Sequence, residues 1–391
     1  AASGGSSGWG LTGNAITACQ CVGTTNNTAF RLHSNGILRI LADSIGKVFI
    51  DSIYVGRGIG TKYNNIAIGD STLQRNTTGN GNTAIGDSAL QLNTSGFDNT
   101  AIGNKAGRAI TSNGGNTFVG SNAGLAVNSI GNTAVGNEAL KAAAGNFNTA
   151  LGFYALKANV GIRNIGIGVN ALLSNTSGGG DIAIGYNAAA ANLTGSSIVV
   201  IGDQAVPLGT GSYTTAVGAA TLPNLTTGVG NLCFGYGSGL GITTGSYNLI
   251  IGGQASALPG SRSNYVIIND GGGNTAFWKD SIGRAGIGTI TPNSSLSVGG
   301  SFSAAYVAKT ANYTATINDY FIDCTSNSFT VTLPTAVGIT GRMYIIKNSG
   351  SATIITTATT SSETIDGTTP PTITTLVPLR VISDGANWKT F

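Results

Sequence analysis

The sequence predicts an all-β protein organised around a parallel β-solenoid, and three observations carry that prediction. A short phrase of the form NTAIG recurs along the chain and closes on a glycine. Successive glycines are 16 or 17 residues apart, a steady period that is typical of repeat architectures. Large and small residues alternate with period two within each phrase, as in a β-strand. The twelve glycines are Gly69, Gly86, Gly103, Gly120, Gly136, Gly152, Gly168, Gly185, Gly202, Gly218, Gly235 and Gly252.

Composition excludes several classes of protein. The 391 residues include 61 glycines, only 9% are charged, and the net charge is +4. The positive charges are scattered, which gives no footprint for nucleic acid or for an anionic membrane. No apolar run approaches the length of a membrane-spanning helix. With four cysteines, no CxxC pair and one histidine, we expect no disulfide framework, no metal site and no cofactor, and we expect Cys233 to be a small core residue.

Two segments precede the repeats. Residues 1–27 are rich in Gly, Ser, Asn and Thr, which indicates a flexible or docking segment. Their start, AASGGSSGWG, would be left by removal of a signal peptide or by methionine excision, and we expect export. Residues 28–60 hold the strand-like runs Ala29–His33, Ile37–Leu41 and Lys47–Ile50, separated by Gly- and Asn-containing turns. They predict a β-meander that caps the array.

The array itself occupies residues 61–256. Each repeat is expected to be a strand, a bend, a short second strand and a turn, so that 16–17 residues make one of twelve coils. The large residue before each glycine is expected to face the coil interior, and the small residue before that to face outward. A thin coil buries little apolar area, so we expect a homotrimer whose subunits meet along the small column: Ala67, Ala84, Ala101, Ala134, Ala150, Ala183 and Ala216.

Beyond the array the period is lost. Residues 257–302 contain Asp280-Ser281-Ile282-Gly283, a near-copy of Asp43-Ser44-Ile45-Gly46, and are expected to form a closing hairpin and a linker. The two related hairpins are expected to cap the two open edges of the solenoid. Residues 303–391 carry eight short strand-like runs divided by turn residues, which predicts a C-terminal all-β domain of the sandwich or barrel type.

The NTAIGDSAL, NTAIGNKAG, NTAVGNEAL and NTALGFYAL phrases resemble the head repeats of trimeric autotransporter adhesins. They resemble still more the related repeats of phage tail fibres and of exported Bacteroidetes proteins, in which phrases like WGLTGNA and GIGTITPNSSLSVGGSF flank the array. The C-terminal phrases LPTA, GRMYIIKNSG, ETIDG and VISDGANW are similar to a small β-domain of tail fibres. The resemblance implies a homotrimer of left-handed parallel β-rolls that works as an extracellular fibre.

Candidate chemistry is sparse. Asp70 and Asp87 follow the glycine in adjacent coils, and paired carboxylates of this kind would suit a glycan-degrading spike. The same column continues with Asn, Ser, Phe and Tyr, which favours a solvated surface pair and no enzyme. Exposed aromatic residues that could stack on sugar rings are the candidate binding residues: Phe97, Phe147, Phe153, Tyr186 and Tyr236. The loops of the C-terminal domain are an alternative receptor surface.

The sequence therefore predicts a non-enzymatic, extracellular or cell-surface structural fibre. Its trimeric rod would present a surface to a glycan or a cell-surface receptor, and it could join head to tail into filaments. A phage tail fibre that recognises a host, carried on the virion tail, is the second hypothesis. A glycan-degrading tailspike is the third.

Overall fold

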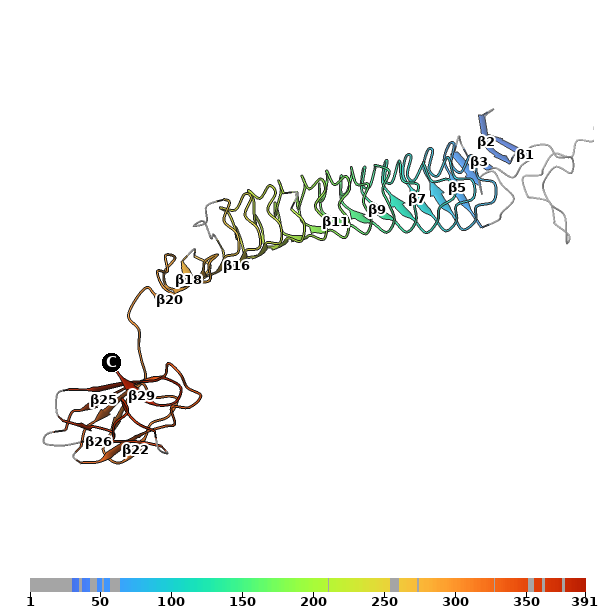
Figure 1. Ribbon diagram of the computed structural model, residues 1–391. Helices are drawn as coiled ribbons and strands as arrows, with labels where there is room; N and C mark the ends of the chain where they lie inside the picture. The colour runs from blue at the N-terminus through green and yellow to red at the C-terminus, as the bar shows by residue number, and fades with distance from the viewer. Residues whose placement is uncertain are drawn as a thin grey trace, which may run out of the picture. The chain divides into compact units, whose positions relative to one another are not determined.

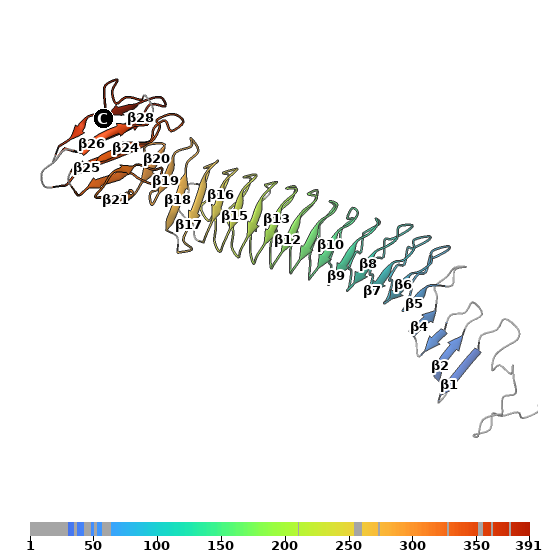
Figure 2. The same ribbon diagram turned by 90° about the horizontal axis from the view of Figure 1, so that it is seen from below.

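The computed structural model describes residues 30–34, 37–42, 48–50, 53–56, 64–209, 211–253, 260–272, 274–326, 328–350, 355–360, 363–374 and 377–391. In these residues all regular structure is β, and no helix that could cross a bilayer occurs among them. The chain forms two compact units, residues 1–299 and 300–391, each drawn in Figure 1 and Figure 2. The predicted segment 1–27 and the turn Asp43–Gly46 lie outside the described residues.

The first unit contains the predicted parallel β-solenoid. Thirteen short strands pair in parallel, each in register with the next, along the ladder in Figure 2. They are β5 Ile66–Ile68, β6 Thr83–Ile85, β7 Thr100–Ile102, β8 Thr117–Val119, β9 Thr133–Val135, β10 Thr149–Leu151, β11 Ile165–Ile167, β12 Ile182–Ile184, β13 Val199–Ile201, β14 Thr215–Val217, β15 Leu232–Phe234, β16 Leu249–Ile251 and β17 Val266–Asn269.

The predicted number of twelve coils is wrong. The solenoid has about 15 turns, of which the ladder from β5 to β17 supplies thirteen strands. The thirteenth coil carries no closing glycine, because Asn269 occupies that position, opposite Gly252 of the preceding coil. The glycine spacing therefore predicts one coil too few in this ladder. Beyond it, β19 Ala285–Ile287 and β20 Leu296–Val298 form another parallel pair.

Each coil from β5 to β16 holds one three-residue strand, β17 has four residues, and the predicted second strand is replaced by tight turns. The turns depend on residues in the left-handed region. In the coil after β6, Ser88 has φ 57°, Leu90 has φ 47° and Asp98 has φ 53°. The closing glycine is required by space as well as by φ: a Cβ on Gly69, at φ +125°, would lie 2.7 Å from the carbonyl oxygen of Gly86 in the next coil.

The predicted facing of the strand is also wrong, because the alanine column lies inside the coil. Ala67 is 6% exposed and the other six predicted contact alanines, Ala84, Ala101, Ala134, Ala150, Ala183 and Ala216, are fully buried within a single chain. The turns fold back so tightly that the interior also receives the buried leucines Leu90 and Leu140. The strand residue beside them is small in most coils, and the large residues just before the glycines point outward. Buried exceptions in the alanine column are Phe118, Val200, Ile250 and Ile267.

Buried asparagines form a second interior column. Four residues before most of the glycines, an asparagine hydrogen-bonds its neighbour one coil away; Asp181, Ile198 and Thr214 replace it in three coils. The backbone N and Nδ2 of Asn99 both donate to Oδ1 of Asn82, each at 3.1 Å, and Nδ2 of Asn99 also donates to the carbonyl of Asn113 at 3.0 Å. Each amide side chain thereby satisfies backbone groups that the tight turns leave without ladder partners.

One member of this column is a carboxyl group. Asp181 is fully buried, and its Oδ1 accepts the backbone N–H of Ile198 at 3.2 Å. Its Oδ2 lies 3.3 Å from Nδ2 of Asn175 and 3.5 Å from Nδ2 of Asn192. Burial raises the pKa of Asp181 to about 6, against the opposing effect of the backbone hydrogen bonds.

Antiparallel strands pair with both edges of the array. Before it, β1 Phe30–Ser34, β2 Ile37–Ala42, β3 Val48–Ile50 and β4 Ile53–Gly56 pair in sequence order, and β4 pairs with β5. After it, β18 Thr275–Lys279 pairs antiparallel with β17 and β19. The open backbone edges of the first and last coils are therefore occupied.

The second unit has two sheets around one core. The strands are β21 Tyr306–Lys309, β22 Tyr313–Thr314, β23 Phe321–Cys324, β24 Thr330–Leu333, β25 Met343–Asn348, β26 Ile355–Thr359, β27 Thr372–Ile373, β28 Leu379–Ser383 and β29 Trp388–Thr390. One sheet has the order β21-β23-β25-β28-β29 and the other β22-β24-β26-β27. From β21 to β26 the chain passes alternately between the sheets, and each sheet pairs these strands in parallel. This unit is therefore wound like a short, wide solenoid.

Candidate functional site

The outer face of the ladder is uncharged and mainly apolar, with threonine in one of its two columns in six coils. Two columns lie on it, one position and three positions before each glycine, and neither contains a charged residue in any coil from β5 to β17. Their members are half-buried or exposed, as at Leu151 (47%), Ile201 (37%) and Ile251 (41%). An apolar face of this length is unusual for the surface of a monomer. We name it the outer ladder face.

Charged groups lie instead on the turns that follow each strand. Glu138 accepts from Lys141 at 2.9 Å and from Lys157 of the next coil at 2.8 Å. The hydrogen bond from Lys157, with that from Lys141, lowers the pKa of Glu138. Polar groups link coils in the same way where Arg108 Nε donates to Gln91 Oε1 at 2.8 Å. This edge is therefore a solvated polar surface, in contrast to the outer ladder face.

All five predicted aromatic residues lie on the surface, but the structure does not gather them into one cluster. Phe153, Tyr186 and Tyr236 follow the strand, whereas Phe97 and Phe147 precede it. Their exposed fractions are 50% for Phe97, 53% for Phe147, 45% for Phe153, 51% for Tyr186 and 63% for Tyr236.

Two further aromatic residues share the column of Phe147 and were not predicted. Tyr213 is 71% exposed and Tyr247 is 64% exposed. The ring of Tyr247 lies over Gly230 of the preceding coil, as that of Phe147 lies over Gly131. The signal was present in the sequence, because Tyr213 and Tyr247 lie five residues before their coil glycines, as Phe147 does.

The predicted carboxylate pair has the geometry of a solvated surface. Asp70 and Asp87 are both exposed, and Asp87 Oδ2 accepts from Asn104 Nδ2 at 3.0 Å. Within the part of the chain that the structure describes, no three His, Cys, Asp or Glu side chains come together as a metal site. Cys233 is fully buried in the alanine column, as predicted, and burial raises its pKa to about 12.

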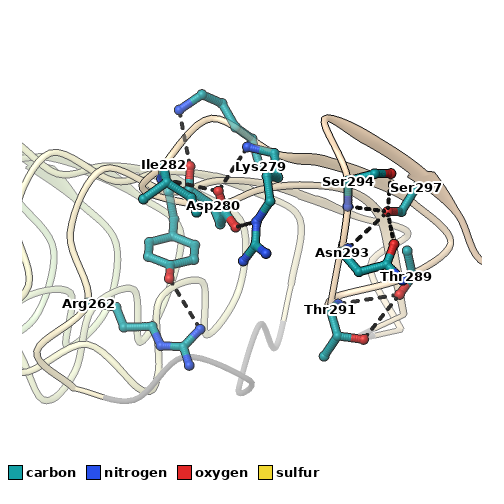
Figure 3. Close-up of polar contacts among 11 residues, drawn as sticks. Arg262, Lys279, Asp280, Ile282, Thr289, Thr291, Asn293, Ser294 and Ser297 are labelled. Atoms are coloured by element: carbon teal, nitrogen blue, oxygen red, sulfur yellow. Dashed lines mark hydrogen bonds and ion pairs between the residues drawn. The ribbon is translucent and has the colours of Figure 1, made fainter.

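A cavity of about 390 Å³ opens beside the last coil of the first unit. Its lining residues are Arg262, Tyr265, Trp278, Asp280, Arg284, Ile290, Thr291, Pro292 and Asn293. Figure 3 shows the polar contacts of this region, with Arg262 on one side and Asp280 on the other. The buried rings of Tyr265 and Trp278 meet edge to face, with centroids 5.3 Å apart.

The charges in this cavity are arranged by the Asp280–Gly283 turn. The carboxylate of Asp280 accepts the backbone N–H of Ile282 at 3.1 Å, that of Arg284 at 2.9 Å and Arg284 Nε at 2.7 Å. Burial raises the pKa of Asp280, but the contacts with Arg284 outweigh that effect and hold it below the ordinary value. Across the cavity, Arg262 Nη1 donates to the hydroxyl of Tyr265 at 3.3 Å. This cavity was not predicted from the sequence.

A second cavity, also about 390 Å³, lies in the second unit where the parallel strands β21, β23 and β25 begin. Phe302 and Ile317, both largely exposed, lie on its rim, and Arg342 lines it. Arg342 Nη2 donates to the carbonyl of Asp319 at 3.3 Å. The Asp319 carboxylate is occupied by Tyr313 and Thr316.

Comparison with known proteins identifies no relative: no family model, no curated protein and no solved structure matches the chain.

Proposed function

We propose that this protein is a structural, non-enzymatic fibre whose rod is a homotrimer and which attaches to a glycan or cell-surface receptor outside the cell. The observation that carries the proposal is the outer ladder face, which leaves the large apolar side chains of thirteen coils uncovered in a single chain. The phrases that resemble adhesin heads and tail fibres support the same assignment.

Two further copies of this chain are the occupants that fit the outer ladder face. The face repeats one apolar pattern at every coil, at about 4.8 Å per coil. A partner with the same period can pack side chain against side chain along the whole length, and an identical chain has that period by construction. A partner with a different period would match at a few coils only. The trimer contact thus moves from the alanine column to the Ile and Val columns.

The strands at the edges of the array act as caps. Because β4 and β18 pair antiparallel with the first and last strands of the ladder, further coils cannot add there in the same register. The rod is then free to present other surfaces: the exposed aromatic residues on its turns and the two cavities. Head-to-tail filaments would have to form through contacts other than continuation of the ladder.

The test is the mass of the purified chain by light scattering, with a pair of outward-facing substitutions. Ile184→Asp with Ile201→Asp would place six carboxylates of three chains within two adjacent coils. We expect three chains per particle for the natural sequence and one for the double variant. Ser177→Asp, at an exposed turn position with no side-chain partner among the described contacts, is the matched control and should stay trimeric. A natural chain that is monomeric at micromolar concentration would refute the proposal.

A further inference from the structure

The last coil of the ladder departs from the repeat at three positions. Arg262 occupies the position of the turn glycine Gly245, Tyr265 that of the ladder asparagine Asn248, and Asn269 that of Gly252. A side chain at this position of the preceding coil is excluded, because a Cβ on Gly245 would collide with the carbonyl of Arg262. The last coil has no such coil stacked on it, so a large side chain can stand there.

Two of these departures, Arg262 and Tyr265, line the cavity beside Trp278 and Asp280. Two guanidinium groups, of Arg262 and Arg284, line one space of about 390 Å³ that has a single carboxylate. That carboxylate, of Asp280, is taken by Arg284 and two backbone N–H groups. Among the described residues Arg262 has no acidic partner, and its one side-chain hydrogen bond goes to the neutral hydroxyl of Tyr265.

We propose that this cavity binds the acidic group of a sugar, a carboxylate or a sulfate ester, with Arg262 as the principal ligand of the charge. A planar guanidinium matches the paired oxygens of either group. The volume lies within the range of small-ligand sites, about 300–1,000 Å³. The aromatic wall of Tyr265 and Trp278 and the polar residues Thr291 and Asn293 provide the mixed lining that a sugar ring requires. The inference deepens the proposed attachment role and rests on it for the choice of a glycan as the partner.

The experiment is isothermal titration calorimetry of the full chain at low salt with four probes: glucose, glucuronic acid, glucose 6-sulfate and inorganic sulfate. We expect binding of one or both acidic sugars, no heat with glucose, and weaker binding of inorganic sulfate. The two acidic sugars separate a carboxylate site from a sulfate site. Binding should weaken as salt is raised, because an exposed arginine is screened.

Arg262→Gln is the decisive variant, since the side chain is exposed and its backbone carbonyl still accepts from Asn248. We expect affinity to fall about ten- to hundredfold, as for loss of a charged hydrogen bond. Arg163→Gln, the same charge change at an exposed turn of the array, should leave affinity unchanged. Tyr265→Phe removes the hydroxyl that orients Arg262 and should weaken binding less than Arg262→Gln.

Equal affinity for inorganic sulfate and for both sugars would overturn sugar recognition and leave a general anion site. Binding that survives Arg262→Gln, or no binding of any acidic probe, would overturn the cavity assignment altogether. These failures are separate from failure of the proposed function. A trimer that attaches to glycan surfaces but binds no probe refutes the cavity alone, whereas probe binding by a chain that is monomeric and attaches to nothing refutes the fibre role alone.

Discussion

Both units stack successive turns of the chain through parallel strand pairs, but they fill their interiors differently. In the array the narrow core is built mainly of alanines, leucines and asparagines, while the large residues just before the glycines stay at the surface. In the second unit the large residues are inside: Tyr344 and Trp388 are fully buried with ring centroids 5.4 Å apart. Trp388 Nε1 donates to the carbonyl of Pro334 at 3.2 Å.

The difference shows what a wide coil gains. Where two sheets are separated by aromatic and aliphatic side chains, one chain buries most of its own apolar surface. Where the coil closes on tight left-handed turns, the interior is narrow, and the large apolar residues just before the glycines are left for a partner to cover. We therefore expect the second unit to be complete as a single chain and the array to be complete only in an assembly.

The largest effect is expected when the two units are separated. A fragment of residues 300–391 should be a monomer with a cooperative thermal transition, and a fragment of residues 1–299 should keep a mass of three chains. Light scattering and circular dichroism give both answers. If the 300–391 fragment also trimerises, or unfolds when cut from the array, the contrast between a complete and an incomplete unit is wrong.

The next largest effect is expected at Phe118, the one aromatic residue in the alanine column from β5 to β17. A Cβ on Gly107 would lie 2.7 Å from the Phe118 ring, and one on Gly124 would also collide with it. Both glycines occupy the position that holds leucine in neighbouring coils, such as Leu90. Phe118→Ala should lower the free energy of unfolding by about 3–5 kcal/mol.

A double variant at positions 107 and 118 is the control for Phe118→Ala. Gly107→Leu alone should destabilise the chain by overpacking, yet in the Phe118→Ala background it should restore part of the loss, because leucine already occupies this column at a similar φ elsewhere. Denaturant unfolding of the four chains gives the cycle. If the losses of the two single variants simply add in the double variant, the sizes of the side chains at positions 107 and 118 are not coupled.

A smaller effect is expected from the carboxyl group in the asparagine column. The pKa of Asp181 is about 6 in the fold, above its ordinary value of 3.8. At a pH between these two pKa values, Asp181 keeps its proton in the folded chain and loses it in the unfolded chain. The free energy of unfolding therefore falls as pH rises from about 4 to 6. Asp181→Asn should raise the free energy of unfolding at pH 7 by about 2–3 kcal/mol and change it little at pH 4.

Denaturant unfolding at the two pH values measures this difference. Asp203→Asn, at an exposed turn position, is the matched control and should show no such pH dependence. Equal stabilisation by Asp181→Asn at both pH values would mean that the carboxyl group is not desolvated by the coil.

Much of the architecture could be predicted from the sequence. The spacing of the glycines determines one coil per repeat, and the period-two phrases determine one parallel strand in each coil, because both are local properties of the chain. The buried asparagines were visible as a column too, although their role as hydrogen-bond partners between coils was not inferred. The positions of the exposed aromatic residues followed from the same reading.

The choice between the two faces of the strand was decided by the tertiary structure. Alternation places Ala and Ile on opposite faces but does not say which face is inside. That depends on the width of the coil, which is set by how tightly residues such as Ser88 and Leu90 turn the chain back. The cavity at Arg262 likewise exists because no coil of the same register stacks on the last one. Both outcomes depend on how coils pack against one another, which no single repeat encodes.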